Sequence, residues 1–481
     1  MDIEKTLIAA VLTAILALVI QYILRRKTSG AIPTVPSWIP FLGSSLDFSS
    51  DPVGFIRSCS ARYGSIFNVY LGGKTMTFFI SPKHYATLLK HRSLSHKPAF
   101  FNVATKALGE STSFNNDVMS LHPSEAAEEY HKLVVTHLLG TSAVKTLVEN
   151  TFHQQRRILA TFDRVGRQSL LDFVQRGIFN AGSRVLLGDS LVDKSPNLLA
   201  DFDAFDKSFP LLVAGVPQVF LRSAVQAREG VVQAIDKNLG DDASTIIQKR
   251  NEAIQEIASV QPLDPARDIM ALLWAGSANS IPTAYWALFY LLRDKAAWRA
   301  VFDEVHEHLP KGGAEVWTPE QLSKCVLLAS AVDEALRLSA SSILMREAME
   351  DIDLKTMDPP VYLAKGSNVI IYPSLGHFDE EIFPSPKTFK YDRFVNATRE
   401  QLEAFKPFGM GATMCPGRNF AKNQIKMFIA LIMQETKRIE LVPGYGEPKN
   451  DPSRLGSCLL STRPYKSNMN YAQVLRSFDM I

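Results

Sequence analysis

One cysteine, Cys415, lies in a loop whose residues suit its sulfur to bind a metal ion. The loop runs from Phe408 to Arg418 (FGMGATMCPGR) and surrounds the cysteine with Gly409, Gly411 and Gly417. Glycines permit tight turns and let backbone N–H groups approach the sulfur. A helix is predicted over 418–433, and both a helix N-terminus and donated N–H bonds favour thiolate over thiol. The pattern therefore predicts an axial ligand of a haem iron.

The other three cysteines have no such surroundings, and we expect Cys59, Cys325 and Cys458 to be small buried apolar residues. Four widely spaced cysteines without paired motifs argue against a disulfide framework, against a zinc site and for a reducing compartment. A formal net charge of +3 on 481 residues gives no reason to expect nucleic-acid binding. The 46% hydrophobic content is sufficient for one large core or two smaller ones.

The motif F-G-x-G-x-x-x-C-P-G-R resembles the haem-binding signature of the cytochrome P-450 superfamily. The resemblance implies a mainly α fold with a small β region, the cytochrome P-450 fold. It also implies heme b (iron protoporphyrin IX) held by the Cys415 thiolate, with Phe408, Gly409, Gly411 and Arg418 around the cofactor.

The resemblance is weaker for the cations that bind the haem propionates. Arg346 stands where family members commonly place such an arginine, but Thr413 stands where many have Arg or His. No W-x-x-x-R pair occurs near residues 132–137. Lys132 and His137 are alternative donors, and each is equally well explained as a surface residue.

Glu334 and Arg337 are three residues apart, on one face of a predicted helix. Their position resembles the E-x-x-R element of the family. The stretch F-K-Y-D-R-F at 389–394 is similar to its P-E-R-F element, with Tyr391 and Asp392 as departures. The resemblance implies that Glu334, Arg337 and Arg393 form a buried, structural charge triad on the proximal side of the haem.

The predicted oxygen side departs from the usual A-G-x-[DE]-T pattern. Ala275 and Gly276 are kept, but Ala278 and Asn279 replace the acid and the threonine that organise proton delivery. Asn279 relays a proton less readily than a hydroxyl, and Ser277, Ser280 and Thr283 supply hydroxyls nearby. Ala278, Asn279 and Ser280 are therefore the predicted catalytic residues.

Pro282 lacks the N–H that would bond the Ala278 carbonyl, so we expect the helix to kink beside Asn279. The alternative is a tolerated proline in a long helix.

The Ala-Asn-Ser-x-Pro pattern, with G-A-T-x-C-P-G-R, is similar to the sterol-hydroxylase group of the family (cholesterol 7α-hydroxylase, sterol 12α-hydroxylase), to which prostacyclin synthase is more distantly related. This favours a monooxygenase that hydroxylates a large apolar steroid or terpenoid with O2. Its electrons would come from an NADPH-dependent FAD/FMN reductase docking over the basic residues Lys406, Arg418, Lys422 and Lys426, which are otherwise a solvated face. Predicted substrate contacts are Trp274, Ser342, Ile343, Leu344 and Leu460.

Two other functions stay open. A P-450-type isomerase or dehydratase of a peroxide or endoperoxide would need neither a proton relay nor a reductase, and the missing acid–alcohol pair favours it. A non-catalytic haem-binding sensor would show no turnover.

The N-terminal run Leu7–Leu24 is apolar and about long enough to cross a bilayer as a helix. Arg25, Arg26 and Lys27 follow it, which predicts a retained single-pass anchor with a cytosolic body at the endoplasmic reticulum. A cleaved signal peptide would show the reverse charge order. We therefore expect an anchor at 1–27, a proline-rich hinge at 28–45 and a haem-binding catalytic domain at 46–481.

Periodicity predicts the elements that position these residues. A β-hairpin is expected at 65–81 with a Gly72-Gly73 turn, and short strands are expected over 361–371. Helices are expected at 126–139, 143–164, 170–187, 224–257, 268–295 and 321–338.

Overall fold

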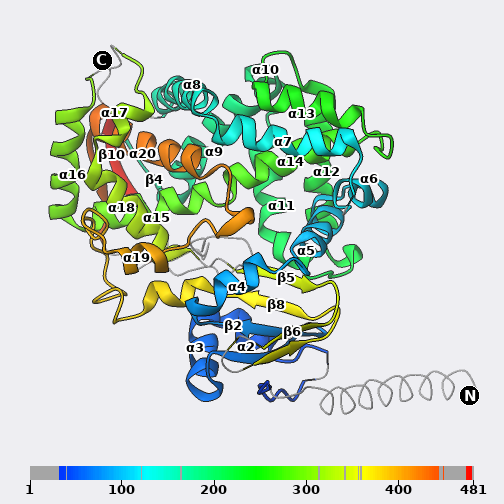
Figure 1. Ribbon diagram of the computed structural model, residues 1–481. Helices are drawn as coiled ribbons and strands as arrows, with labels where there is room; N and C mark the ends of the chain where they lie inside the picture. Colours follow the sequence, from blue (N-terminus) through cyan, green and yellow to red (C-terminus); the bar gives the residue numbers. More distant parts are fainter. Residues whose placement is uncertain are drawn as a thin grey trace, which may run out of the picture. The chain divides into compact units, whose positions relative to one another are not determined.

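The computed structural model describes residues 32–39, 41–120, 122–162, 165–311, 315–340, 343–355, 357, 360–443, 448 and 473–478 (Figure 1). They belong to two compact units, one with residues up to 99 and 343–375, the other with 100–342 and 376–481. The predicted anchor, Cys458, Ser342 and Leu460 lie outside the described residues. Among the helices within those ranges, none is both long and apolar enough to cross a bilayer.

The first unit is built on a five-stranded sheet with the order β1-β2-β8-β5-β3. The predicted hairpin is confirmed, with antiparallel strands and with Gly72 and Gly73 at φ 53° and 83°. Strand β8 pairs parallel to β2 and antiparallel to β5, which joins two distant parts of the chain. The strands are β1 Ile66–Leu71, β2 Lys74–Phe79, β3 Leu94–Ser95, β5 Leu344–Ala348 and β8 Asn368–Ile371, with a separate pair β6 Ile352–Leu354 and β7 Val361–Leu363.

The described residues 32–39 of the predicted proline-rich hinge form no helix, and they are hydrogen-bonded to β1. The N–H of Val35 donates to the Asn68 carbonyl at 2.8 Å, and the N–H of Asn68 donates to the Pro33 carbonyl at 2.8 Å. The segment is thus held against the free edge of β1. The helices of this unit are α2 Ser45–Ser50, α3 Pro52–Tyr63 and α4 Tyr85–Lys90, and α5 Lys97–Asn102 follows.

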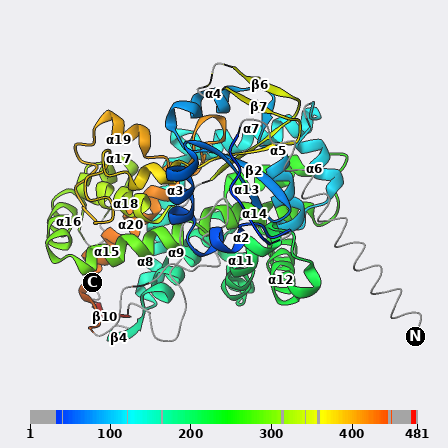
Figure 2. The same ribbon diagram turned by 90° about the horizontal axis from the view of Figure 1, so that it is seen from below.

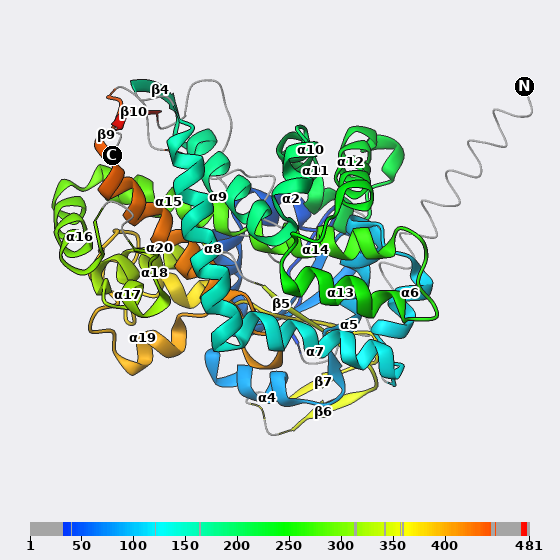
Figure 3. The ribbon, with the colours of Figure 1, turned by 90° about the horizontal axis from the view of Figure 1, so that it is seen from above.

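The second unit is mainly helical and contains a small sheet of order β4-β10-β9 (Val165–Ser169, Gln473–Phe478 and Thr436–Leu441). Helix α20 packs against α8, α9, α15 and α18, and α11 lies beside α12 (Figures 2 and 3). Most of α20 after its first turn is buried, as expected for a helix that is apolar on nearly all sides. The helices are α6 Thr112–Val118, α7 Glu125–Leu139, α8 Thr141–Ala160, α9 Leu170–Leu187, α10 Asp189–Lys194, α11 Leu198–Val213, α12 Arg222–Asn238, α13 Thr245–Gln255, α14 Asp264–Ser277, α15 Ser280–Arg293, α16 Lys295–His308, α17 Pro319–Ser323, α18 Val326–Ser339, α19 Arg399–Ala404 and α20 Arg418–Glu435.

Three of the predicted helices are each divided into two in the structure. The predicted helix 224–257 is two helices, since the turn residues 239–244, including Gly240, separate α12 from α13. The helix predicted over 321–338 divides into α17 and α18. The helix predicted over 268–295 divides into α14 and α15, and it ends at Arg293 because the Asp294 side chain caps α16 through the N–H groups of Ala296 and Ala297, both at 3.0 Å.

A buried polar network joins α7, α13 and α14 to the turn before α6. Arg250 donates to both carboxylate oxygens of Asp268, at 2.6 and 3.0 Å, and the Tyr130 hydroxyl donates to Asp268 at 2.6 Å. Glu110, 8% exposed, accepts from the Asn115 amide at 2.9 Å. Burial and the nearby Asp268 raise the pKa of Glu110 from 4.5 to about 8.

Glu110 should make the protein less stable at alkaline pH. Its folded-state pKa lies above its unfolded value, so stability is full below pH 4.5 and is lost as the pH rises through about 8. Glu110→Gln, which resembles the protonated acid, should match the wild type in urea unfolding at pH 4 and be about 4–5 kcal/mol more stable at pH 9. Equal stabilities at pH 9 would show that Glu110 ionises normally.

Candidate active site

The cysteine loop adopts the turns that its glycines predict. Gly409 and Gly411 have φ of 73° and 67°, in the left-handed region that favours glycine. The N–H of Cys415 donates to the Phe408 carbonyl at 3.0 Å, which closes the loop. Helix α20 begins at Arg418, three residues after the cysteine, as predicted.

The sulfur of Cys415 accepts backbone N–H bonds from Gly417 and Arg418. Burial raises the pKa of the Cys415 thiol, and these two N–H groups together with the Arg418 charge oppose that rise. Cys59 and Cys325 are different, because they are buried and apolar burial raises their pKa values to about 11 and about 12. Among the described cysteines, Cys415 is therefore the one with partial exposure and donors directed at its sulfur.

These features fit a haem-thiolate ligand. The N–H groups of Gly417 and Arg418 and the Arg418 charge favour the thiolate over the thiol, and a bound metal ion would favour it further. The Arg418 guanidinium donates to the Cys415 carbonyl at 3.0 Å and fixes the peptide next to the sulfur. Phe408, partly buried, packs against the main hydrophobic core.

The helix on the predicted oxygen side is interrupted at Ala278 and Asn279, where α14 ends and α15 begins. Pro282 is buried in the first turn of α15 and cannot bond the Ala278 carbonyl, which agrees with the expected break. The Thr283 hydroxyl donates to the Asn279 carbonyl at 2.8 Å, so it is committed to the helix backbone.

One face of α14 stays open although its flanks are buried. Ala275 is exposed, and Gly276 and Asn279 are partly exposed, whereas Trp274, Ser277, Ala278 and Ser280 are buried. Small residues at this spacing leave room for a flat group against the helix. Helix α15, which follows α14 in the chain, packs on α20, and the open face and the cysteine loop both lie in the second unit.

The predicted charge triad is brought together by the structure. Arg337 donates to both carboxylate oxygens of Glu334, at 2.8 and 2.9 Å, and Arg393 donates to the same carboxylate at 2.9 Å. The Glu334 and Arg337 side chains are fully buried, and that of Arg393 is 5% exposed. Arg393 also donates to the carbonyls of Pro384, Ser385 and Thr388. The buried charges are thus paired and hydrogen-bonded.

A residue that the sequence reasoning missed, His377, adjoins this triad. Its carbonyl accepts a hydrogen bond from Arg337, and its Nε2 accepts the N–H of Lys406 at 3.1 Å. Burial and the Arg337 charge lower the pKa of His377 to about 3. His377 belongs to none of the motifs described above, because its role depends on a contact with a residue 29 positions away in the chain.

The predicted propionate donors differ in their surroundings. Arg346, on β5 in the first unit, is 6% exposed, and burial lowers the pKa of its guanidinium. Lys132 has a 66% exposed side chain near Glu129, which matches the alternative of a surface residue. The Thr413 hydroxyl bonds the Met410 carbonyl at 3.4 Å, within the cysteine loop itself.

The basic residues predicted to form a docking face are not equivalent. Lys426 is 7% exposed and donates to the Leu322 carbonyl, and its burial and the nearby Lys422 lower its pKa to about 8. Lys426 is therefore excluded from a docking face. Lys422 pairs with Asp333 at 2.7 Å, and Lys406 donates to the Leu402 carbonyl at 2.7 Å.

Trp274, one of the predicted substrate contacts, lies on α14, the helix next to the predicted oxygen-binding residues. Its indole N–H donates to Asp206 at 3.0 Å, and its ring stacks on Phe209 with 3.9 Å between centroids. Both partners are on α11, so Trp274 joins α14 to α11. Ile343 and Leu344 are in the first unit, and Ile343 is buried.

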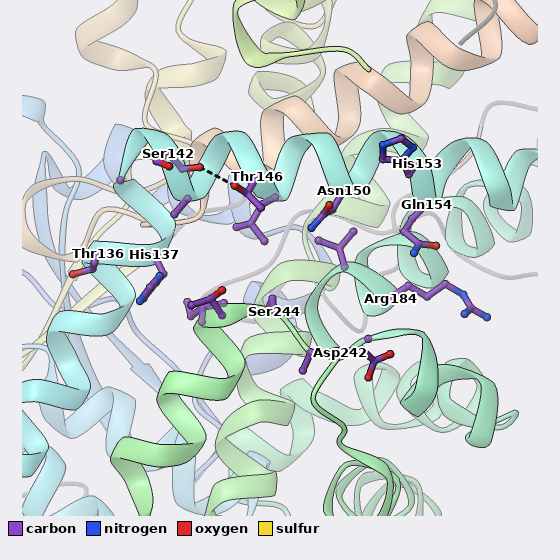
Figure 4. A pocket seen from close by; sticks show the side chains of 18 of the residues that line it. Thr136, His137, Ser142, Thr146, Asn150, His153, Gln154, Arg184, Asp242 and Ser244 are labelled. Atoms are coloured by element: carbon purple, nitrogen blue, oxygen red, sulfur yellow. Dashed lines mark hydrogen bonds between the residues drawn. The ribbon is translucent and has the colours of Figure 1, made fainter. Parts of the chain in front are cut away.

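A cavity of about 750 Å³ lies in the second unit between α7, α8 and the start of α13 (Figure 4). Neither Cys415 nor Asn279 lines it, and His137, the other alternative propionate donor, does. Its lining includes many hydroxyl, amide and charged side chains. The labelled side chains are Thr136, His137, Ser142, Thr146, Asn150, His153, Gln154, Arg184, Asp242 and Ser244.

A mainly helical unit with a cysteine loop bounded by glycines is typical of a haem-thiolate protein. Comparison with known proteins identifies the family. The family model for cytochrome P450 matches residues 33–469, so the chain belongs to the cytochrome P450 family. Members of this family bind haem through a cysteine thiolate, and the chain is a cytochrome P450 monooxygenase by this membership.

Several relatives of the chain are named for the sterol that they oxidise. Cytochrome P450 7A1 of Oryctolagus cuniculus is 31% identical over 91% of this chain and 92% of its own length. Cholesterol 7-alpha-monooxygenase of Cricetulus griseus is 31% identical over 91% and 92% of the two chains. The 7-alpha-hydroxycholest-4-en-3-one 12-alpha-hydroxylase of Homo sapiens is 28% identical over 93% and 95%. The predicted group within the family is thereby confirmed.

Proposed function

We propose that this protein hydroxylates a steroid-type substrate with O2, using electrons from an NADPH-dependent FAD/FMN reductase. The observation that carries the proposal is the cysteine loop, with two N–H groups directed at the Cys415 sulfur, in a chain that matches named sterol hydroxylases along nine-tenths of its length. The relatives supply the substrate class, and the loop supplies the means of holding a haem.

The haem, when bound, supplies the activation of dioxygen, favoured by electron donation from a thiolate ligand. The protein's own contribution on that side rests with Ala278, Asn279 and Ser280. The Asn279 side chain carries both donor and acceptor atoms and is partly exposed at the helix break, so it can hold a water molecule there. Ala278 leaves space beside it, and the buried Ser280 adds a hydroxyl. The family resemblance is the basis for proposing Arg346 as a propionate-binding residue.

The departures at Ala278 and Asn279 favour a second function. An isomerase or dehydratase of a peroxide receives its oxygen already activated and needs no acid–alcohol pair. The two functions differ in their need for electrons, so they can be separated directly.

Full-length protein in membranes, coupled to a cytochrome P450 reductase and NADPH, should convert members of a sterol panel to products heavier by one oxygen atom, measured by mass spectrometry. Label from ¹⁸O2 should appear in the product. Product formed without NADPH or reductase from an endoperoxide would favour the isomerase. Carbon monoxide binding without any turnover across sterols, terpenoids and peroxides would favour the sensor.

Asn279→Ala should lower the product formed per NADPH consumed by roughly tenfold, because a water molecule at the helix break would lose the side chain proposed to hold it. The thiolate-type ferrous–carbon monoxide band should stay unchanged and serves as the control for intact haem. An unaltered yield would remove Asn279 from the proton-delivery role.

We also propose the endoplasmic reticulum membrane as the location, with one span near the N-terminus and a cytosolic catalytic domain. The charge order around Leu7–Leu24 supports it. The sequon Asn396-Ala397-Thr398 provides a test, because a cytosolic body keeps Asn396 unglycosylated. A glycosidase-sensitive mass shift at Asn396 would place the body in the lumen.

A further inference from the structure

The His377 imidazole lies between the charge triad and the cysteine loop. His377 is fully buried, and its ring is 5.6 Å from that of Phe405, between centroids. Its backbone carbonyl faces Arg337, which is paired with Glu334, and its Nε2 faces the N–H of Lys406. His377 thus receives one hydrogen bond from the triad and one from Lys406, two residues before the cysteine loop.

The Lys406 end of this contact continues into the loop. The Lys406 carbonyl accepts the N–H of Gly409 at 3.2 Å, which forms the turn at the loop's start. The N–H of Cys415 then donates to the Phe408 carbonyl at 3.0 Å. A series of hydrogen bonds therefore connects the buried Glu334 carboxylate, through Arg337 and His377, to the turn at the start of the cysteine loop.

The protonation state of the ring suits this contact. A histidine whose pKa is about 3 is neutral at physiological pH, and a neutral imidazole has one acceptor nitrogen. Since Nε2 accepts from Lys406, the proton is on Nδ1, for which no partner occurs among the described residues. Among the described residues, the hydrogen bond from the Lys406 N–H is therefore the single hydrogen bond of the His377 ring.

We propose that His377 is a positioning residue for the haem ligand: its Nε2 fixes the Lys406 N–H and thereby holds the start of the cysteine loop against the charge triad. The position of Cys415 then depends on the triad through a side-chain acceptor as well as through packing. This role concerns haem ligation and is independent of which substrate is oxidised.

The test compares His377→Gln, whose side-chain oxygen can take the place of Nε2, with His377→Met, which has similar length and no comparable acceptor. The haem-loaded proteins are reduced under carbon monoxide, and the thiolate-type band is measured as a fraction of total haem. We expect His377→Met to lose at least half of this band and to release haem roughly tenfold faster, as for other residues that support a metal ligand. His377→Gln should restore most of both. A general packing role would instead lower the melting temperature of both variants and leave the band fraction of folded protein unchanged.

If His377→Met does not fold, the proposal is tested by amide hydrogen exchange of the wild-type holoprotein. Lys406 is only partly buried, so slow exchange of its N–H requires the acceptor. Protection comparable to that of the α20 amides would support the proposal. Exchange at the rate of an unprotected amide would overturn it, as would a full thiolate band in folded His377→Met.

Discussion

Replacing Cys415 by serine should abolish the thiolate-type ferrous–carbon monoxide band and reduce monooxygenation to background. The structure gives the reason, because the two N–H groups from Gly417 and Arg418 are directed at one sulfur atom. A serine hydroxyl there stays protonated at neutral pH, so these donors cannot generate an anionic ligand. The measurement is the ferrous–carbon monoxide spectrum together with sterol turnover in reductase-coupled membranes.

Two other cysteines provide matched controls. Cys59 and Cys325 are buried, with thiol pKa values raised by burial to about 11 and about 12, so neither is a thiolate at neutral pH. Cys59→Ser and Cys325→Ser should therefore keep the thiolate-type band, with only the modest destabilisation of a buried hydroxyl. Persistence of that band in Cys415→Ser would show that another residue is the ligand.

The local features of the site were predictable because their causes are local. The positions of Gly409 and Gly411 required left-handed turns, and the i,i+3 spacing of Glu334 and Arg337 placed both on one helix face. The hairpin followed from β-branched and aromatic residues on either side of Gly72-Gly73. Pro282 marked the helix break beside Asn279.

What could not be predicted depends on contacts between distant residues. Lys426 has the charge of a surface residue, and only the packing of α20 against its neighbours shows that it is buried. His377 lies outside every motif that we used, and its partners are 40 and 29 residues away along the chain. The long apolar patterns also concealed helix ends such as the turn at Gly240, since periodicity continues across a short break.

Replacing Glu334 by alanine should cost about 3–5 kcal/mol of unfolding free energy, enough to prevent accumulation of holoprotein in a marginally stable chain. Glu334 is the common partner of Arg337 and Arg393, and all three side chains are buried. Without the Glu334 carboxylate, the triad keeps two buried guanidinium groups and has no negative charge to pair with them. Urea unfolding of the holoprotein, with haem content measured in parallel, gives the change in stability.

An exposed ion pair separates this effect from the general loss of a salt bridge. Arg299 and Asp303 pair at 2.9 Å with side chains 75% and 55% exposed, and Asp303→Ala should change stability by no more than about 0.5 kcal/mol. Glu334→Gln removes the negative charge and keeps one acceptor oxygen, while an NH2 donor replaces the other oxygen. We expect Glu334→Gln to lose most of what Glu334→Ala loses, since two buried cations then face a neutral group. A Glu334→Gln protein with wild-type stability and haem content would mean that hydrogen bonding, rather than charge, holds Arg337 and Arg393 in place.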